Sequence, residues 1–289
     1  MQRIHIVNPA AGKGYAETKI KSDSDDIIYH TTSAGDGERY AYEISQQYDE
    51  CELVVYGGDG SVCDVVNGIM RAKTNDRCII SVVPAGSGND LVRCLTSDVI
   101  QSDVIKFNDR YSSNLINIGF DCSVAQKTNK YKRIPFIKGS LSYTFAIADV
   151  LFRRMWHELE IEYVDADGNE VKLGKDKYLL IGIANGQYYG GGYRCASAAQ
   201  LNDGLLDIIT VKNISRPRFF SLIGDYKKGT HLTPDGTVIS RFADVVNCVK
   251  CRSIKISGMQ AVCADGEIYE YHDVNISLVP SAIRIRKYE

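Results

Sequence analysis

The stretch ELVVYGGDGS, residues 52–61, decides how this chain folds. Strand-type residues from Glu52 to Tyr56 run directly into a turn in which glycines surround one acid, Asp59. Glycine leaves backbone N–H groups open to an anion, and a helix that starts after the turn adds the positive end of its dipole. A lone carboxylate there suits a cation that accompanies phosphate. The pattern therefore indicates a strand, a turn and a helix that together form a site for a nucleoside triphosphate.

Around this stretch, residues 1–110 alternate between short apolar runs and segments of helical periodicity. Predicted strands lie at residues 4–7, 26–29, 53–56 and 78–83, and predicted helices begin at about residue 14 and span residues 35–48 and 61–72. This alternation predicts an α/β domain with a mainly parallel sheet. Ligands collect at the carboxyl ends of the strands in such sheets. The turns at residues 8–12, 57–61 and 84–90 are therefore predicted to converge on one crevice.

Residues 111–279 predict a second domain of a different kind. Short β-rich segments follow one another at residues 115–118, 159–163, 178–184, 205–211, 253–257, 260–263 and 274–278. They predict an antiparallel β-sandwich domain of two packed sheets. One helical run, residues 140–157, is strongly apolar, and packing in a core explains it better than a membrane anchor. A last strand at residues 282–286 is predicted to return to the first domain, so that residues 280–289 would complete it.

The composition is that of an ordinary folded protein. The chain has 289 residues, with 34 basic and 36 acidic side chains and a formal net charge of -2. This balance gives no reason to expect a nucleic-acid partner, although Lys130, Lys132, Arg133 and Lys138 form a local basic patch. No apolar stretch reaches the roughly 20 residues that span a bilayer, and the first residues do not resemble a signal peptide. We expect a cytoplasmic protein whose nine cysteines are free thiols.

The glycine-rich turns match neither of two common nucleotide fingerprints, the P-loop and the dinucleotide motif. Together they resemble the diacylglycerol kinase catalytic-domain family, bacterial lipid kinases related to sphingosine kinases, with more distant similarity to NAD kinases and phosphofructokinases. Ser61 and Ser87 stand where the family usually has threonine and keep its hydroxyl, whereas no proline follows the triple glycine. The resemblance extends over nearly the whole chain. Its further segments are residues 31–32, 84–93, 118–121, 184–186, 190–192, 202–207, 229–231 and 265–267.

The resemblance implies that the three glycine turns bind ATP, because backbone amides and hydroxyls can cradle its phosphates. It also implies Mg²⁺ near Asp59 and Asp121, whose carboxylates suit this ion. As an ordinary turn residue, Asp59 would instead bond its own backbone. The implied nucleotide contacts are Asn8, Pro9, Ala10, Ala11, Gly12, Thr32, Gly57, Gly58, Asp59, Gly60, Ser61, Gly86, Ser87, Gly88 and Asn89.

A second Mg²⁺ site is implied away from the nucleotide. It would use Asp203 and the main-chain carbonyls of Gln200 and Leu205, since a hard cation accepts such oxygens. Residues 202–204, Asn-Asp-Gly, are equally suited to a plain turn, so both interpretations stay open here.

Phosphoryl transfer to an alcohol needs a group that accepts the hydroxyl proton. The resemblance implies that the Asp-Gly-Glu turn at residues 265–267 faces the nucleotide from the second domain. We assign the base to Glu267, with Asp265 as the contender or a metal partner, and expect transfer to depend on Asp59. A type I hairpin turn without a catalytic role fits residues 264–267 equally well.

The resemblance thus implies an ATP-dependent, Mg²⁺-assisted lipid kinase that transfers the γ-phosphoryl group to a hydroxyl of diacylglycerol or a related long-chain lipid. It would meet this lipid as a peripheral protein at the inner membrane surface, and a homodimer is one option for its assembly. Two alternatives stay open, a kinase of a soluble acceptor such as NAD and a catalytically silent regulator that binds lipid or nucleotide. The presence of Asp59, Asp121, Asp265 and Glu267 favours an active enzyme.

Overall fold

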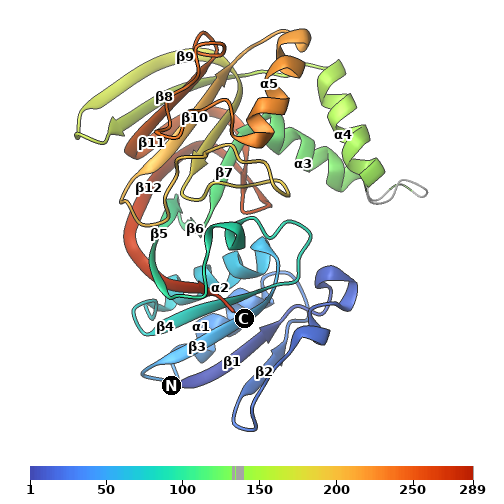
Figure 1. The fold of residues 1–289 in the computed structure, drawn as a ribbon, viewed down its shortest axis with the longest axis vertical. Helices are drawn as coiled ribbons and strands as arrows, with labels where there is room; N and C mark the ends of the chain where they lie inside the picture. Colours follow the sequence, from blue (N-terminus) through green and yellow to red (C-terminus); the bar gives the residue numbers. More distant parts are fainter. Residues whose placement is uncertain (132–133, 135–139, 289) are drawn as a thin grey trace.

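The structure, a computed structural model, describes residues 1–131, 134 and 140–288. Two lobes are joined by the long strand β12 (Figure 1). Lys132, Arg133 and Lys138 of the predicted basic patch lie outside the described residues. The N-terminal lobe contains β1 (Gln2–Val7), η1 (Ala11–Gly14), η2 (Glu17–Lys19), β2 (Ile27–His30), α1 (Asp36–Ile44), β3 (Cys51–Gly57), α2 (Asp59–Ala72), β4 (Cys78–Pro84) and η3 (Leu91–Cys94).

The remaining elements form the C-terminal lobe and its connection to the first. They are β5 (Ile100–Phe107), β6 (Arg110–Ser112), β7 (Leu115–Gly119), α3 (Phe120–Tyr131), α4 (Ser140–Phe152), β8 (His157–Asp165), β9 (Glu170–Ala184), β10 (Leu206–Lys212), α5 (Arg216–Lys228), β11 (Val246–Ala264) and β12 (Glu267–Lys287). Both β5 and β6 lie where the two lobes meet (Figure 1).

The strands of the N-terminal lobe run in the order β2, β1, β3, β4 and β12, and each neighbouring pair is parallel. All residues of β3 are buried, as expected for a strand that is covered on both faces. Parallel strands end at the same edge of the sheet, so the turns after β1, β3 and β4 lie together there.

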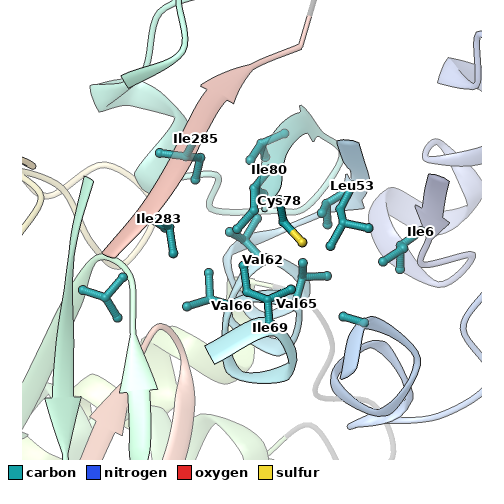
Figure 2. Close-up of a cluster of buried hydrophobic side chains, with 14 of the residues drawn as sticks. Ile6, Leu53, Val62, Val65, Val66, Ile69, Cys78, Ile80, Ile283 and Ile285 are labelled. Carbon is teal, nitrogen blue, oxygen red and sulfur yellow. The ribbon is translucent and has the colours of Figure 1, made fainter. Parts of the chain in front are cut away.

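The core of this lobe fixes α2 against the sheet (Figure 2). Val62, Val65, Val66 and Ile69 recur at helical spacing on one face of α2 and are almost fully buried. Ile283 and Ile285 of β12 belong to the same cluster, because residues 284–287 pair with β4. Burial of each such side chain contributes about 1.5–3 kcal/mol, so the start of α2 has a fixed place beside β4 and β12.

The helix that was predicted from about Gly14 is not present; η1 and η2 are short turns. Gly12 and Lys13 both have a φ of 58°, which a right-handed helix does not accommodate. Ala16 is the one buried residue between residues 8 and 20. A helix without an apolar face to bury gains little stability, which explains the error.

The C-terminal lobe is antiparallel, as predicted, but its layers are not two separate sheets. Both β9 and β11 pair with β7 and also with β10, so the layers share these two strands. The 19-residue strand β11 reaches both layers because its register shifts between Ser257 and Gln260. Gly258 has a φ of 125° at this bulge. The segments that were predicted as two strands, residues 253–257 and 260–263, are therefore one bent strand.

Three helices, α3, α4 and α5, lie on one side of the C-terminal lobe (Figure 1). The sequence predicted only one helical run here, residues 140–157, and α4 ends at Phe152. Core packing explains one face of α4, where Ala146 and Val150 are buried, whereas Phe145 and Phe152 are exposed. None of the described helices combines the length and the apolar character that crossing a bilayer requires.

Candidate active site

A pocket of about 1590 Å³ lies between the two lobes. The N-terminal lobe contributes the three glycine-rich turns, and the C-terminal lobe contributes the β11–β12 hairpin and the helices α3, α4 and α5. Most of the predicted site residues line it, namely Asn8, Pro9, Ala10, Ala11, Gly12, Thr32, Gly58, Asp59, Gly60, Ser61, Gly86, Ser87, Gly88, Asp121, Asp265 and Glu267.

Direct backbone contact brings the glycine turns together. A methyl group on Gly86 would lie 2.4 Å from Cα of Gly58, so only glycine allows the two turns to approach this closely. The carbonyl of Gly57 accepts hydrogen bonds from the N–H groups of Ala85 and Gly86, at 2.9 and 3.1 Å. Nδ2 of Asn8 donates to the Ser61 hydroxyl at 3.2 Å and connects the first turn to this pair.

Two predicted nucleotide contacts, Gly57 and Asn89, do not line the pocket. The Gly57 carbonyl joins the two turns as described above. Oδ1 of Asn89 accepts a hydrogen bond from the Gly86 N–H, and its Nδ2 donates to the Gly86 carbonyl, both at 2.9 Å. These residues therefore shape the turns that face the pocket.

Asp59 is the first residue of α2, where the helix dipole is positive. Its Oδ1 accepts a hydrogen bond from the Leu91 N–H at 3.1 Å. Its Oδ2 faces Gly88, and a methyl group on that glycine would lie 2.9 Å from this oxygen. The absence of a side chain at Gly88 thus leaves room beside the second carboxylate oxygen, as a cation bound there would require.

Glu267 lies opposite the start of α2. A methyl group on Gly60 would be 3.6 Å from its Oε1, and the side chain is exposed to the pocket. Two residues, Asp265 and Gly266, connect β11 to β12, and their φ angles are 47° and 93°. Positive φ at both positions defines a type I′ hairpin turn, which corrects the predicted type I turn. The turn is both a structural hairpin and the element that carries Glu267 into the pocket.

Asp265 is buried and fully engaged in hydrogen bonds. Its oxygens accept bonds from the hydroxyl of Ser112 at 2.9 Å, from the N–H of Ser113 at 2.8 Å and from the N–H of Leu115 at 3.0 Å. Burial raises the pKa of Asp265, and these hydrogen bonds offset part of that rise. Its side chain therefore holds the hairpin against the segment between β6 and β7.

The pocket has a large excess of acidic side chains. Among the described residues, the acids that line it are Glu38, Asp59, Asp64, Asp90, Asp121, Asp265 and Glu267, and the basic side chains are Lys13 and Arg110. Burial and the charges of Glu38 and Glu267 raise the pKa of Asp64 to about 6. Such a field disfavours a bare polyphosphate and favours one whose charge is offset by bound cations.

Mg²⁺ fits this arrangement as an ion held jointly by protein and phosphate. No group of three His, Cys, Asp or Glu side chains in the described part of the chain converges into a complete metal cage. Such a cage is not needed, because Mg²⁺ is commonly bound through one or two carboxylates and the phosphates of the substrate. Asp59 has a suitably open oxygen, and Asp121 lines the same pocket.

The other predicted polar residues are held by neighbouring side chains. Asp36 accepts hydrogen bonds from the N–H and the hydroxyl of Thr32, at 2.9 and 3.0 Å, and these bonds help to lower the pKa of Asp36 to about 2. Asp121 is the second residue of α3 and accepts a 2.5 Å hydrogen bond from the Tyr189 hydroxyl. Burial raises the pKa of Asp121 to about 6.

Asp203, Gln200 and Leu205 lie away from this pocket and do not line it. Nζ of Lys250 lies 2.7 Å from Oδ2 of Asp203 and 2.8 Å from Oδ2 of Asp207. An ammonium group thus already serves as the cationic partner of Oδ2 of Asp203. This arrangement does not fit an additional Mg²⁺, and no step of the chemistry is derived from one.

The sequence reasoning missed several residues that complete the pocket. Oδ2 of Asp90 accepts a hydrogen bond from the Gly191 N–H at 2.8 Å, which links the triple glycine of one lobe to the other. Arg110 pairs with Glu38 at 2.8 Å and lies over the ring of Tyr269. The Asn-Asp motif at residues 89–90 and the triple glycine at residues 190–192 were the sequence signals for the contact between Asp90 and Gly191. No pattern in the sequence around Arg110 indicated its pairing with Glu38.

Two family models together match almost the entire chain. The diacylglycerol kinase catalytic domain matches residues 3–110, and the YegS C-terminal NAD kinase beta sandwich-like domain matches residues 114–287.

Similar proteins cover the chain in the same way. A protein of Bacillus subtilis (strain 168) named "Putative lipid kinase YtlR" is 27% identical, over 97% of this chain and 98% of its own length. A "Diacylglycerol kinase" of the same organism is 26% identical, over 92% and 90%. The crystal structure of a diacylglycerol kinase from Bacillus anthracis str. Sterne has a TM-score of 0.69 at 23% identity, covers 99% of this chain and 97% of that one, and shows the same fold. The chain therefore belongs to the diacylglycerol kinase family and is a phosphotransferase with an alcohol group as acceptor.

Proposed function

We propose that this protein is an ATP-dependent lipid kinase that uses Mg²⁺ to phosphorylate a hydroxyl of diacylglycerol or a related long-chain lipid. One observation carries the proposal, namely that a polar and an apolar end share a single pocket. The glycine turns and Glu267 line the polar end. Acyl chains suit the apolar end, whereas a soluble acceptor such as NAD has no long apolar chain to fill it. The apolar side chains are Phe120, Val124, Ile147, Leu151, Phe219, Phe220 and Ile223.

The lobes divide the two substrates between them. We assign the nucleotide to residues 1–110 completed by residues 280–289, and the lipid to residues 111–279. The backbone N–H groups of the glycine turns would bind the phosphates of ATP, and Asp59 and Asp121 would hold Mg²⁺. When bound, this ion offsets the charge of the phosphates, which the acidic pocket would otherwise repel.

Glu267 is the side chain best placed to accept a proton. As the lipid hydroxyl oxygen forms its bond to the γ-phosphorus, the bond from that phosphorus to the β,γ-bridging oxygen breaks and ADP leaves. The hydroxyl proton passes to the Glu267 carboxylate, which lies beside Gly60 at the phosphate turn. Asp265 accepts too many hydrogen bonds to serve as this base, and we assign it the role of a positioning residue.

Mass spectrometry of a total lipid extract, incubated with the protein, ATP and Mg²⁺, tests the proposal. A phosphomonoester of a neutral lipid should appear. Glu267→Gln should lower kcat by about 10²–10⁴-fold, the usual contribution of a general base. Glu270→Gln is the matched control, because Glu270 is exposed on the same strand and does not line the pocket.

Two results would contradict the proposal. Phosphorylation of NAD in the absence of any lipid product would identify a kinase of a soluble acceptor. Binding of ATP without transfer to any hydroxyl would identify a silent regulator. Asp59→Asn adds a further check, because it should abolish transfer while the thermal unfolding curve stays that of a folded protein.

A further inference from the structure

We propose that the C-terminal lobe docks on an anionic phospholipid bilayer through one defined surface. This docking face consists of Leu141, Phe145 and Phe152 of α4, Phe220 of α5, and the nearby Arg153, Arg154 and Arg216. The inference rests on the proposed lipid kinase function, because it explains how a lipid held in a membrane reaches the pocket.

The apolar side chains of the docking face are unusually exposed. Leu141 is 54% exposed, Phe145 49%, Phe152 84% and Phe220 63%. On α4 the three residues are spaced by four and seven positions, which places them on one side of the helix. The opposite side of α4 holds the buried Ala146 and Val150. One face of this apolar helix is buried in the core, whereas the other is exposed to solvent. An exposed apolar face of this kind is typical of a surface that binds a membrane or another protein.

The end of α4 and the start of α5 form one continuous surface. The guanidinium of Arg216 donates hydrogen bonds to the carbonyls of Leu151 and Arg153, at 2.6 and 3.1 Å. These bonds hold the first turn of α5 beside Phe152, and the two helices lie on the same side of the lobe (Figure 1). A bilayer can therefore contact both helices at once.

The charges on this surface favour an anionic bilayer. Arg153, Arg154 and Arg216 are exposed, and each basic side chain near an anionic membrane adds about 1 kcal/mol of attraction. Asp149 is the one acid of α4, and it is paired with Lys127 and Arg153. The same arginines would repel one another across a symmetric dimer, which disfavours a second copy of the chain as the occupant.

Trp156 adds an independent feature that is typical of a membrane interface. It is the single tryptophan of the chain, and the Arg154 guanidinium lies 3.6 Å and the Lys177 ammonium 4.5 Å from the centre of its ring. Tryptophan is enriched at membrane–water interfaces, where its amphipathic ring lies at the level of the lipid headgroups.

The docking face is continuous with the pocket. Leu151 and Phe220 line the apolar end of the pocket, and Phe220 is also a member of the docking face. A lipid could thus pass from the bilayer along α4 and α5 into the pocket while its acyl chains stay out of water. Docking elsewhere on the molecule would require these chains to cross solvent.

Cosedimentation with vesicles, without nucleotide, tests this inference. The probes are vesicles of phosphatidylcholine alone and of phosphatidylcholine with phosphatidylglycerol. The wild-type chain should bind the mixed vesicles, with a blue shift of Trp156 fluorescence, and bind neutral vesicles weakly. Phe145→Ser/Phe152→Ser should lower binding to the mixed vesicles by roughly tenfold or more, because the variant loses two phenyl groups that the bilayer would bury. Leu173→Ser is the matched control, since Leu173 is 41% exposed on β9, away from the docking face.

Activity measured in two ways separates docking from catalysis. The double variant should phosphorylate a short-chain diacylglycerol dissolved as monomers at the wild-type rate and lose activity on vesicles. Equal vesicle binding by the double variant and the wild type would overturn the docking face, even if lipid is phosphorylated. A dimer of the wild type that the double variant converts to monomers would also overturn it, in favour of a contact between copies. Vesicle binding that depends on the docking face, without transfer to any lipid, would support docking and refute only the proposed kinase function.

Discussion

Asp265 accepts hydrogen bonds from both the backbone N–H and the hydroxyl of Ser113, at 2.8 and 3.2 Å. The other carboxylate oxygen accepts bonds from the backbone N–H groups of Asn114 and Leu115. The turn that precedes Glu267 is thereby tied to the segment where the chain enters the C-terminal lobe. A buried carboxylate two residues away thus controls the position of the proposed base.

Asp265→Ala should therefore reduce stability as well as activity. Removal of the carboxylate leaves several buried donors without an acceptor, and hydrogen bonds to a charged group contribute about 1.5–3 kcal/mol each. We expect the free energy of unfolding in urea to fall by about 3 kcal/mol. Glu267→Gln, in contrast, should leave it within about 0.5 kcal/mol of the wild type, because Glu267 is exposed. Activity loss in Asp265→Ala at unchanged stability would instead identify Asp265 as the base.

Gly86→Ala should weaken ATP binding, because a methyl group at this position collides with Cα of Gly58 and forces the two phosphate turns apart. We expect the KM for ATP to rise by about tenfold, which corresponds to roughly 1.4 kcal/mol. Gly224→Ala is the control for a glycine substitution in general. Nothing lies within 4 Å of the position of its methyl group, and it is inside α5, so this variant should gain about 0.5–1 kcal/mol of stability. An unchanged KM in Gly86→Ala would refute the role of these turns.

Asp64 predicts a dependence of stability on pH. Burial and the nearby Glu38 and Glu267 raise its pKa to about 6 in the folded protein, from the ordinary value of 3.8. The folded state thus binds this proton more tightly than the unfolded state. Below about pH 4 the carboxyl is protonated in both states and does not reduce the free energy of unfolding. Between about pH 4 and 6 the unfolded state loses this proton first, so the free energy of unfolding falls as the pH rises. Above about pH 6 the reduction is complete.

Asp64→Asn removes this cost, so the variant should be more stable than the wild type at pH 7.5. We expect about 1 kcal/mol, since solvent screens a half-buried side chain, and the difference should shrink as the pH falls toward 4. Urea unfolding at pH 7.5 and pH 4.5 measures it. Asp76→Asn, an exposed position beyond the end of α2, provides the control. A gain in Asp64→Asn that is equal at both pH values would contradict this explanation.

The sequence was informative where local chemistry determines structure. The strand-turn-helix at residues 52–61 could be predicted because an apolar run followed by glycines and an acid is typical of a strand that ends in an anion-binding turn before a helix. The sequence was uninformative where contacts between residues far apart in the chain determine the structure. Nothing near Asp265 reveals the donors of Ser113 and Leu115, which lie about 150 residues earlier in the chain.

The missed helices have a similar explanation. Both α3 and α5 carry polar residues on the side that faces solvent and pack one edge on the pocket, so their apolar periodicity is weak. These helices line the apolar end of the pocket. The apolar end of the pocket is the part that would distinguish a lipid acceptor from a soluble one. The sequence pattern predicted this part of the site least well.

The ion pairs of Lys250 lead to a prediction about Mg²⁺ binding at Asp203, the second metal site that the family resemblance implies. The Lys250 ammonium bridges Asp203 and Asp207, so Lys250→Met leaves two neighbouring carboxylates without their shared cationic partner. Stability in metal-free buffer should fall by about 2 kcal/mol, less than for a fully buried pair, because Lys250 is 33% exposed. Millimolar Mg²⁺ should restore part of this loss, since the freed carboxylate oxygens can bind it. Lys255→Met, at an exposed position on the same strand, should show neither effect. Equal stabilisation of the wild type by Mg²⁺, abolished by Asp203→Asn, would instead mean that Asp203 binds the metal while Lys250 is present, at the second site that the family resemblance implies.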